Sequence, residues 1–335
     1  MAFDLGIDMG SSHTRIYLKK HGLVVDEPSL VIVNNSGQAI AIGDDASEMI
    51  GRTPDGVEAI RPVRNGVITS FQATVAMLKH FIKKAAGNPF LKVRVVIGVP
   101  SGITEVERRA VEEAVKNAGA KDVYMIEEPL AAALGCGVDL TEPKGTMIAD
   151  VGAGVTEVAV VSLGGIVVSQ SVRIAGETFD NDIVQYVKKN FNMVVGDVTA
   201  ENLKMAVGAA IPFKNSDIGE MKGRDSVSGL PKTIAMTSNE ISEALTDSVN
   251  SIVDVIKSTL EKTPPELAAD ILQTGIILTG GGARLRGLGK LIQVKTEIPV
   301  YIAEEPMECA AIGAGKSLEN MNSLKYRPSF DVFRR

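Results

Sequence analysis

Apolar and polar positions along the chain fall into two recurring patterns, one typical of strands and one typical of amphipathic helices. The segment 93–100, VRVVIGVP, is a nearly continuous apolar run that a proline ends, as expected of a strand buried on both faces. In the segment 104–119, Thr104 and Glu107 have capping-box spacing, the apolar residues share one helical face, and Gly119 ends the pattern. These two segments predict a strand followed by a crossover helix.

Further segments continue this alternation. Residues 123–137 read as a short strand, two glutamates and a helix of small residues with Pro129 in its first turn. Residues 237–263 carry apolar side chains at helical spacing and predict one long helix that ends before Pro264. The residues before it, 210–236, are rich in glycine, proline and mixed charge and predict a hairpin or irregular region. The order of elements predicts an α/β fold with helices over mainly β sheets.

Two segments far apart in the chain share one pattern. Residues 3–20 and 146–163 both read as an apolar strand, an Asp-x-Gly turn with small residues, and a second strand that starts at a threonine. A chain that begins each half with the same strand-turn-strand device predicts two similarly built domains that face one another.

Composition narrows the class of protein. The 335 residues are 45% hydrophobic and 23% charged, which is typical of a globular chain long enough for two cores or one large divided core. The formal net charge of −6 provides no overall basic surface, so nucleic acid is not expected as a partner. The two cysteines and three histidines favour a reducing cytoplasm over a disulfide framework or a metal site. The pattern predicts neither a signal peptide nor a membrane-spanning helix of roughly 18 apolar residues.

The two Asp-x-Gly turns are the candidate chemistry of this chain. Such a turn exposes several backbone N–H groups in one direction, and the lack of a glycine side chain lets an anion approach closely. Each turn alone is equally compatible with an ordinary hairpin. Two copies headed by aspartates, with a third glycine cluster at 280–282 after a buried strand, favour a nucleotide bound with Mg²⁺, which carboxylates reach directly or through its waters.

Another glycine-rich segment is a decoy. Residues 310–317, AAIGAGKS, miss the P-loop pattern by one residue, because Ala310 stands where its first glycine belongs. No β-run leads directly into this segment, and its small residues predict a tightly packed helix. We therefore do not expect a working P-loop here.

A family resemblance covers nearly the whole chain and is carried, in chain order, by the motifs GIDMGSS, VVIGVPSGITEVERRA, IEEPLAAALG, DVGAGVTEVAVVSLGG, RIAGETFD, LEKTPPELAADI and ILTGGGARLRGL. The chain resembles the actin, sugar-kinase and DnaK-type chaperone superfamily and, within it, the bacterial actin MreB family with its Mbl relatives. The resemblance implies an α/β, actin-like (ribonuclease H-like, duplicated) two-lobed fold with four subdomains. The boundaries that we expect are 1–30, 64–142 and 305–330 for subdomain IA, 31–63 for IB, 143–178 and 238–304 for IIA, 179–237 for IIB, and 331–335 for a tail.

The resemblance also implies ATP and Mg²⁺ as cofactors and assigns residues to the phosphate end of their site. Asp8 is expected near Mg²⁺, and Asp150 is expected to orient metal-bound water. Glu128 occupies the place of the carboxylate that positions the attacking water, which suits a base at a helix start, whereas Glu127 is expected to be structural. The other residues of the two phosphate motifs are Gly10, Ser11, Ser12 and His13 in the first and Gly152, Ala153, Gly154 and Val155 in the second.

Further residues match the nucleoside end of the family's site. The adenosine motif of this chain consists of Gly280, Gly281, Gly282 and Arg284. Glu201 and Lys204 lie where the family contacts the ribose or the base. A solvated helix face is an equally good interpretation of Glu201 and Lys204.

The second phosphate motif departs from the family pattern. Val155 stands where the family usually has a threonine that helps to hold water, and Ala153 stands where it usually has a glycine. Loss of one oriented hydrogen bond near a transition state costs on the order of 100-fold in rate. Thr156 is a possible substitute, but strand alternation points it to the other face. The first motif is also unusual, with Ser-Ser-His at 11–13. We therefore expect ATP binding with slow hydrolysis.

A membrane contact is expected from the same resemblance. In residues 83–94, KKAAGNPFLKVR, the turn presents Phe90 and Leu91 between lysines, a suitable shape for insertion beside anionic headgroups, although both residues could simply begin the core strand that follows. The tail 324–335 mixes aromatic and basic residues and is either a second membrane contact or a disordered end.

The expected function is that of a cytoplasmic bacterial actin, peripheral at the inner face of the cell membrane. Its expected partners are other copies of itself in head-to-tail, paired protofilaments, the membrane, and membrane proteins of cell shape or wall synthesis. Two alternatives stay open. One is a structural paralogue that binds nucleotide, hardly hydrolyses it, and supports helical shape or motility. The other is a soluble kinase or chaperone-like ATPase on the same scaffold.

Overall fold

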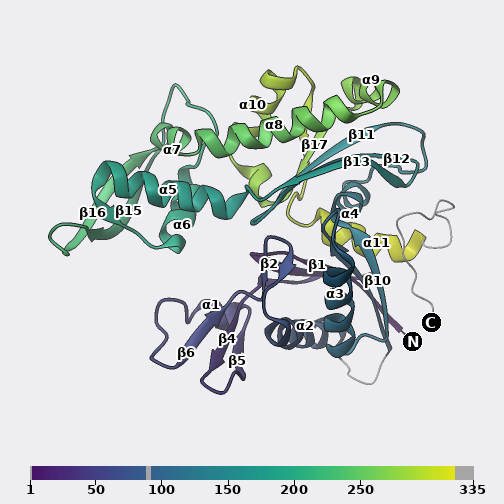
Figure 1. Cartoon of the computed structure of the whole chain (residues 1–335), viewed down its shortest axis with the longest axis horizontal. Helices are drawn as coiled ribbons and strands as arrows, with labels where there is room; N and C mark the ends of the chain where they lie inside the picture. Colours follow the sequence, from purple (N-terminus) through teal and green to yellow (C-terminus); the bar gives the residue numbers. More distant parts are fainter. Residues whose placement is uncertain (1, 88–91, 321–335) are drawn as a thin grey trace.

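Two five-stranded sheets with the same topology organise the structure, a computed structural model that describes residues 2–87 and 92–320 (Figure 1). The first sheet has the order β10-β9-β1-β2-β3, with β10 Asp122–Glu127, β9 Lys92–Val99, β1 Ala2–Met9, β2 His13–Leu18 and β3 Gly22–Pro28. The second has the order β18-β17-β11-β12-β13, with β18 Val300–Ile302, β17 Ile276–Thr279, β11 Thr146–Val151, β12 Thr156–Ser162 and β13 Gly165–Val172.

Strand directions confirm that the two halves are similarly built. In the first sheet β1 pairs antiparallel with β2 and parallel with β9. In the second sheet β11 pairs antiparallel with β12 and parallel with β17. The two Asp-x-Gly turns therefore occupy equivalent places, each connecting the central strand of a sheet to its antiparallel neighbour.

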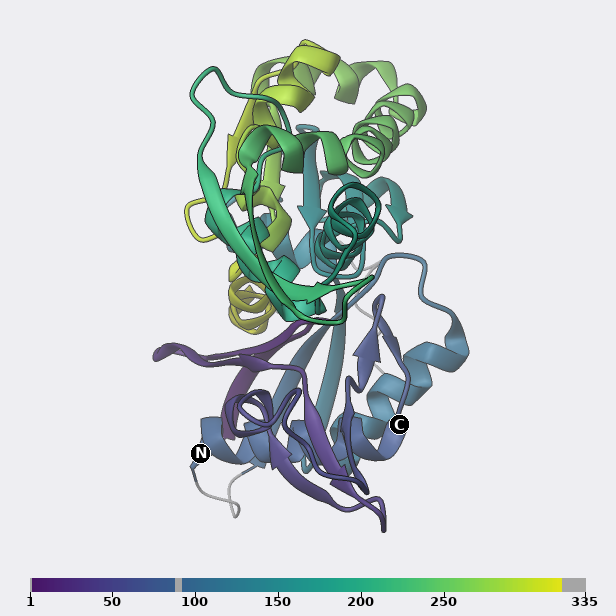
Figure 2. The same ribbon diagram turned by 90° about the vertical axis from the view of Figure 1, so that its left-hand side faces the viewer.

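Helices cover the sheets and also lie between them (Figures 1 and 2). The first lobe carries α2 Phe71–Ala86 and α3 Glu105–Asn117, and the second carries α8 Thr246–Lys262, α9 Pro265–Thr274 and α10 Leu288–Thr296. Two more helices, α4 Glu128–Gly135 and α11 Cys309–Asn320, pack against each other. Their buried residues share one apolar cluster with Val96 of the first sheet and Ile148 of the second, so this helix pair joins the lobes.

Each lobe carries a smaller β region. In the first lobe these elements are β4 Val31–Asn34, β5 Ala39–Ile42, β6 Val57–Ile60 and α1 Asp44–Ser47, followed by the hairpin β7 Val63–Arg64 and β8 Val67–Ile68. In the second lobe they are α5 Gly176–Phe191, β14 Met193–Val194, α6 Asp197–Val207, β15 Ile218–Asp225, β16 Pro231–Thr237 and α7 Ser238–Ala244. The β15–β16 pair confirms the hairpin expected within 210–236. The subdomain boundaries remain predictions.

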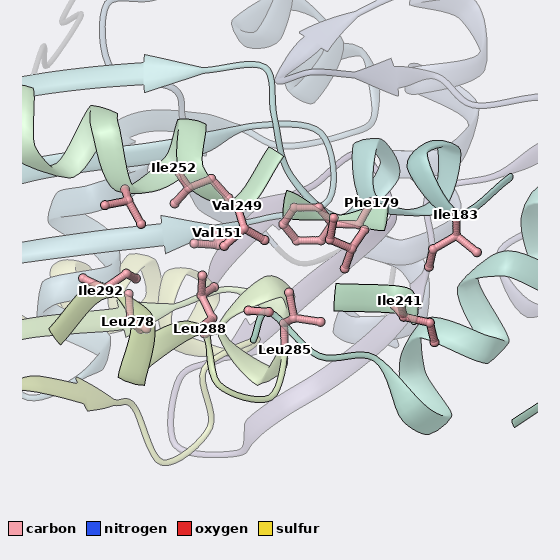
Figure 3. Packing of buried hydrophobic residues seen from close by; sticks show 14 of the residues in the cluster. Val151, Phe179, Ile183, Ile241, Val249, Ile252, Leu278, Leu285, Leu288 and Ile292 are labelled. Carbon is pink, nitrogen blue, oxygen red and sulfur yellow. The ribbon is translucent and has the colours of Figure 1, made fainter. Parts of the chain in front are cut away.

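The core of the second lobe shows why the periodic apolar positions matter. Phe179 and Ile183 from α5 meet Val249 and Ile252 from α8 and Leu278 from β17 in one buried cluster (Figure 3). Burying a side chain of this size contributes about 1.5–3 kcal/mol. A separate cluster fills the first lobe.

The single long helix expected over 237–263 is wrong, because the structure contains two helices that meet at Leu245. The backbone of Leu245 has φ −89° and ψ −2°, which is still right-handed but departs from the values of a regular α-helix, about −63° and −42°. The Thr246 hydroxyl donates a hydrogen bond of 2.9 Å to the Ser242 carbonyl, one turn earlier, and such back-bonding is known to bend helices. Apolar spacing continues across this break, so periodicity alone does not reveal it.

Local signals at helix starts predict the structure better than apolar periodicity over a long segment does. Capping boxes are present at Thr104 with Glu107 and at Thr237 with Glu240, as expected. Residues 310–317 lie inside α11, which confirms a helix in place of a P-loop. Within the described ranges, no helix has the length and apolarity needed to cross a membrane.

Candidate functional site

A cavity of about 810 Å³ is lined by residues of both lobes. The structure brings to this one cavity all of the residues that the sequence assigned to nucleotide and metal. They are Asp8, Gly10, Ser11, Ser12, His13, Glu128, Asp150, Gly152, Ala153, Gly154, Val155, Glu201, Lys204, Gly280, Gly281, Gly282 and Arg284. Their placement is therefore compatible with one shared ligand, and their individual roles stay predictions.

The two Asp-x-Gly turns have matching backbone geometry. The Gly10 N–H donates to the His13 carbonyl at 3.0 Å, and the Gly152 N–H donates to the Val155 carbonyl at the same distance. By this geometry His13 occupies in the first turn the place that Val155 occupies in the second. The turns also face each other, since a Cβ added to Gly154 would lie 2.8 Å from Ser11 Oγ. Glycine at 154 therefore permits the close approach of the two lobes.

The aspartates at the start of the turns lie on the cavity floor, where protein atoms surround them although each keeps some surface open to the cavity. Burial raises the pKa of Asp8 to about 6, while Arg15 opposes the shift and Asp26 adds to it. Burial also raises the pKa of Asp150 to about 7, and the nearby Asp8 contributes to that shift. Two neighbouring carboxylates with raised pKa values form a place where a cation is stabilising.

This arrangement fits Mg²⁺ only together with a phosphate ligand. Within the described part of the chain, no group of three or more His, Cys, Asp or Glu residues could hold a metal ion. Mg²⁺ is usually bound through one or two carboxylates, several waters and substrate phosphates, so Asp8 and Asp150 suffice when a nucleotide supplies the remaining oxygens. The two carboxylates are thus suited to a metal that arrives with its nucleotide.

Glu128, the expected base, is the first residue of α4 and lines the same cavity. Burial raises the pKa of its carboxyl well above the usual value, and repulsion from Glu157, Asp8 and Asp150 adds to the shift. Glu127 does not appear among the cavity residues, which agrees with its expected structural place. A carboxylate with a raised pKa at a helix start in this cavity is suited to accept a proton.

Glu157 is a cavity residue that the sequence reasoning missed. It is 2% exposed, and its Oε1 accepts hydrogen bonds from the Ser101 N–H at 2.9 Å and the Ser101 hydroxyl at 3.1 Å. Ser101 follows β9 of the first sheet, so this contact crosses between the lobes. The other oxygen, Oε2, has no hydrogen-bond partner within the described residues. Burial raises the pKa of Glu157 to about 8, opposed by the Ser101 backbone hydrogen bond.

A signal for Glu157 existed in the repeat. Asp150 lies opposite Glu157 in the β11–β12 pair, and Asp8 lies opposite Arg15 in the β1–β2 pair. Aligning the two turns residue by residue would have paired Arg15 with Glu157, a reversal of charge at equivalent places. Arg15 also forms an ion pair of 3.1 Å with Asp26.

Val155 and Thr156 lie as the strand pattern predicted. Val155 lines the cavity, whereas Thr156 is fully buried and does not appear among the cavity residues. The Thr156 hydroxyl donates to the Ile174 carbonyl at 2.6 Å. The Thr156 hydroxyl is therefore already hydrogen-bonded outside the cavity and does not replace the missing hydroxyl of the turn.

Lys204 is held in place by residues that adjoin the second Asp-x-Gly turn. Its ammonium group forms an ion pair of 2.8 Å with Asp180 and donates to the Gly176 carbonyl at 3.0 Å. The side chain of Lys204 is only 15% exposed, so the alternative of a solvated helix face is wrong for this residue. Glu201 lines the cavity and is partly exposed, which leaves both interpretations of Glu201 open.

The glycine cluster after β17 closes around Asp150. Gly280 has φ +79°, and a Cβ added there would lie 2.3 Å from Asp150 Oδ1. The Gly280 N–H donates to the Pro306 carbonyl at 2.8 Å. A Cβ added to Gly281 would make only an ordinary contact, 3.8 Å from Met307 Sδ. Only glycine fits at 280 without strain. Arg284 is exposed and pairs with Glu305 at 3.4 Å.

Phe90 and Leu91 of the expected membrane loop lie outside the described residues, as does the whole tail 324–335. The structure therefore does not test either expectation.

Comparison with known proteins bears on the whole chain. A family model described as MreB/Mbl protein matches residues 2–326. The cell shape-determining protein Mbl of Bacillus subtilis (strain 168) is 46% identical over 328 residues, which cover 97% of this chain and 98% of that protein. The cell shape-determining protein MreB of Escherichia coli (strain K12) is 46% identical over 323 residues, which cover 94% of this chain and 93% of that protein.

Solved structures agree with this similarity. MreB 5 of Spiroplasma citri bound to AMPPNP has a TM-score of 0.91 and 35% identity, covering 96% of this chain and 98% of that one. A MamK double helical filament has a TM-score of 0.80 at 20% identity, covering 95% and 99%, which is a similarity of fold alone. The expected actin-like α/β fold and the expected family are thereby confirmed.

Proposed function

Since this chain belongs to the MreB/Mbl family, we propose that it is an ATP-binding bacterial actin whose filaments determine cell shape. The observation that carries the proposal is the pair of matching turns that face each other across the interlobe cavity. A similar protein, MreB 5 of Spiroplasma citri, has been solved bound to AMPPNP and to ADP. A nucleotide between the lobes would couple cleft closure to the shape that each end of the molecule presents to the next copy.

We assign the phosphates to the backbone N–H groups of the two turns, with Asp8 and Asp150 toward Mg²⁺. When bound, Mg²⁺ would offset the phosphate charge that otherwise repels these carboxylates. Glu128 would orient the attacking water and accept its proton on a carboxylate oxygen. Glycine at 280 leaves room for the Asp150 carboxylate. Asp180 orients Lys204, which we assign with Glu201 to the ribose or the base of the nucleotide.

A second candidate function is favoured by Val155. The valine side chain lines the cavity and has no hydrogen-bonding group, and Thr156 is committed to the Ile174 carbonyl. A protein of this design would bind ATP and assemble while hydrolysing it slowly. We therefore also propose a structural paralogue that supports helical shape or motility without needing rapid turnover.

Sedimentation in ATP, ADP and a non-hydrolysable ATP analogue tests both candidates. A filament that needs turnover would differ between ATP and the analogue, whereas the structural paralogue would pellet equally in both. A chain that stays in the supernatant under all three conditions contradicts both proposals and favours a soluble ATPase. Phosphate release, followed in the same samples, reports hydrolysis directly.

Location at the inner membrane surface and guidance of wall synthesis are proposed from the family and from the sequence of the 83–94 loop. The wild-type chain should sediment together with liposomes that carry anionic headgroups. A variant with Phe90→Ser and Leu91→Ser should stay in the supernatant. The matched control changes Val227 and Leu230 to serine, since those apolar residues are exposed at 88% and 65% on the β15–β16 hairpin. Equal loss in both variants would contradict the loop as the contact, and deletion of 324–335 tests the tail separately.

A further inference from the structure

The two cysteines of the chain meet although 173 positions separate them. Cys136 Sγ and Cys309 Sγ lie 3.4 Å apart, and both thiols are free. A disulfide needs an S–S distance of about 2.05 Å, so the two sulfur atoms must approach by little more than one ångström. A small change in side-chain torsion on each helix end is of that size.

The backbones around the two thiols are close enough for such a bond. A Cβ added to Gly135 would lie 1.9 Å from the Cys309 carbonyl oxygen and 2.8 Å from the Cys309 Cα. The neighbouring crossing of α4 and α11 is equally tight, since a Cβ added to Gly313 would lie 1.7 Å from the Ala131 carbonyl oxygen. Disulfides bridge residues whose Cα atoms are roughly 4.4–6.8 Å apart, which direct backbone contact of this kind permits.

The two cysteines lie where the chain passes between the two lobes. Cys136 directly follows α4, at the start of the segment 136–145 through which the chain passes from the first sheet to the second. Cys309 is the first residue of α11, at the end of the segment 303–308 through which the chain returns. The pair therefore joins the two connections between the lobes at their common end.

The pair is reachable from solvent. A second cavity of about 400 Å³ is lined by Cys136 and Cys309 together with residues of the second lobe such as Tyr301. Cys136 is partly exposed, whereas Cys309 is only 4% exposed and donates to the Glu305 carbonyl at 3.3 Å. The hydrogen bond with Cys309 lowers the pKa of Cys136, against the effect of burial. Cys136 is therefore the thiol that a reagent meets first.

We propose that Cys136 and Cys309 form a reversible disulfide that restrains the hinge between the lobes, with a low-molecular-weight disulfide as the oxidant. The Cys136 thiolate attacks one sulfur of the reagent, forms a mixed disulfide and releases one equivalent of the reagent thiol. The Cys309 thiol then gives up its proton and attacks Cys136 Sγ, which releases the second equivalent. Two protein thiols are oxidised and one reagent disulfide is reduced to two thiols, so atoms and electrons balance.

The chemical test uses the full chain, without nucleotide, in buffers of oxidised and reduced glutathione. After an acid quench and maleimide labelling, we expect a monomer that has lost two hydrogens, carries no label, and yields a cross-linked peptide that joins positions 136 and 309. A reductant should restore both labels. Cys136→Ser and Cys309→Ser each leave one thiol and should retain at most a mixed disulfide. A persistent glutathione adduct on the wild type, a cross-linked dimer, or two free thiols would overturn the proposal.

The hinge restraint needs its own readout. In hydrogen exchange, amides of 137–145 and 303–308 should slow on the order of tenfold in the oxidised chain, while α2 stays unchanged. The same oxidising buffer should leave exchange in Cys136→Ser as it was. Unchanged exchange in both segments of a fully disulfide-bonded chain would contradict the restraint. Because no nucleotide is present, failure here is distinct from failure of the ATP-binding proposal.

Discussion

In the first turn of the cavity Asp8 faces Arg15 across the strand pair, whereas in the second turn Asp150 faces Glu157. The backbones match, with the same 3.0 Å hydrogen bond closing each turn. The residues opposite the aspartates do not match in charge, because Asp8 faces Arg15 and Asp150 faces Glu157. Arg15 opposes the effect of burial at both aspartates, yet the pKa of Asp150 is raised to about 7 and that of Asp8 only to about 6. A duplicated scaffold has thus been specialised by side chains, and the second turn depends more on a cation brought by the ligand.

The difference extends to the neighbours of each turn. Glu128 and Glu157 add carboxyl groups near Asp150, and burial with mutual repulsion raises the pKa of Glu128. Glu157 also receives both donors of Ser101 from the first lobe. We infer that the second turn is where hydrolysis is controlled and that the first turn chiefly anchors the phosphates.

Glu128→Gln should have the largest effect on the second turn. Loss of a general base lowers rates by about 10²–10⁴-fold, so single-turnover phosphate release should fall by that factor while ATP affinity stays within a few-fold. The matched control is Glu127→Gln, one residue earlier and not among the cavity residues. Equal losses in both variants would contradict Glu128 as the base.

Val155→Thr tests whether ATP hydrolysis is slow because the second turn lacks one hydroxyl. Phosphate release in a single turnover should rise by up to about 100-fold, since an oriented hydrogen bond near the transition state is restored. His13→Thr places the same side chain at the equivalent position of the first turn and should give no gain. No gain from Val155→Thr, or the same gain from both, would reject the comparison.

Asp8→Asn and Asp150→Asn test whether the two aspartates act through Mg²⁺ when ATP binds. With Mg²⁺ present, ATP affinity measured by calorimetry should fall by about 10–100-fold in each variant. In EDTA the effect of Asp150→Asn should reverse and ATP affinity should rise, because without Mg²⁺ the wild-type carboxylate repels the phosphates and asparagine removes that repulsion. Asp254→Asn, at an exposed place in α8, serves as control. A loss that is the same with and without Mg²⁺ would show that the aspartates act only through folding.

Glu157→Gln should have the smallest effect, visible as a change in the pH dependence of stability. Burial raises the pKa of Glu157 from its ordinary value of 4.5 to about 8 in the folded chain. The folded state therefore binds more protons between these two values, and stability falls as the pH rises through that window. Glutamine removes this contribution. Without metal or nucleotide, the melting temperature of the variant should drop less between pH 5 and 8 than that of the wild type. In Arg15→Gln the melting temperature should drop more over the same pH range, because Asp8 loses the cation that opposes the rise of its pKa. Identical pH slopes of the melting temperature in all three chains would contradict the assignment.

Much of this arrangement could be predicted from sequence, because repeated turns and helix caps are local signals. The Asp-x-Gly repeats predicted two similar halves, and the capping boxes at Thr104 and Thr237 placed two helix starts. Glu157 is a polar residue within a buried strand and has no periodic signature, so only a residue-by-residue alignment of the two repeats points to it. The break at Leu245 interrupts a segment whose apolar spacing continues across it, and the meeting of Cys136 with Cys309 depends on how two helices cross. Such features follow from tertiary packing.

Titration calorimetry of ATP into the full chain, with Mg²⁺ and then with EDTA, tests the nucleotide clamp most directly. If the two turns hold the phosphates of one nucleotide around Mg²⁺, binding should show one site per chain and weaken by about 10-fold or more without the metal. Gly280→Ala should weaken it further, because its Cβ would lie 2.3 Å from Asp150 Oδ1, whereas Gly281→Ala should not. The absence of binding, or binding of equal strength with and without Mg²⁺, would contradict this role of the two turns.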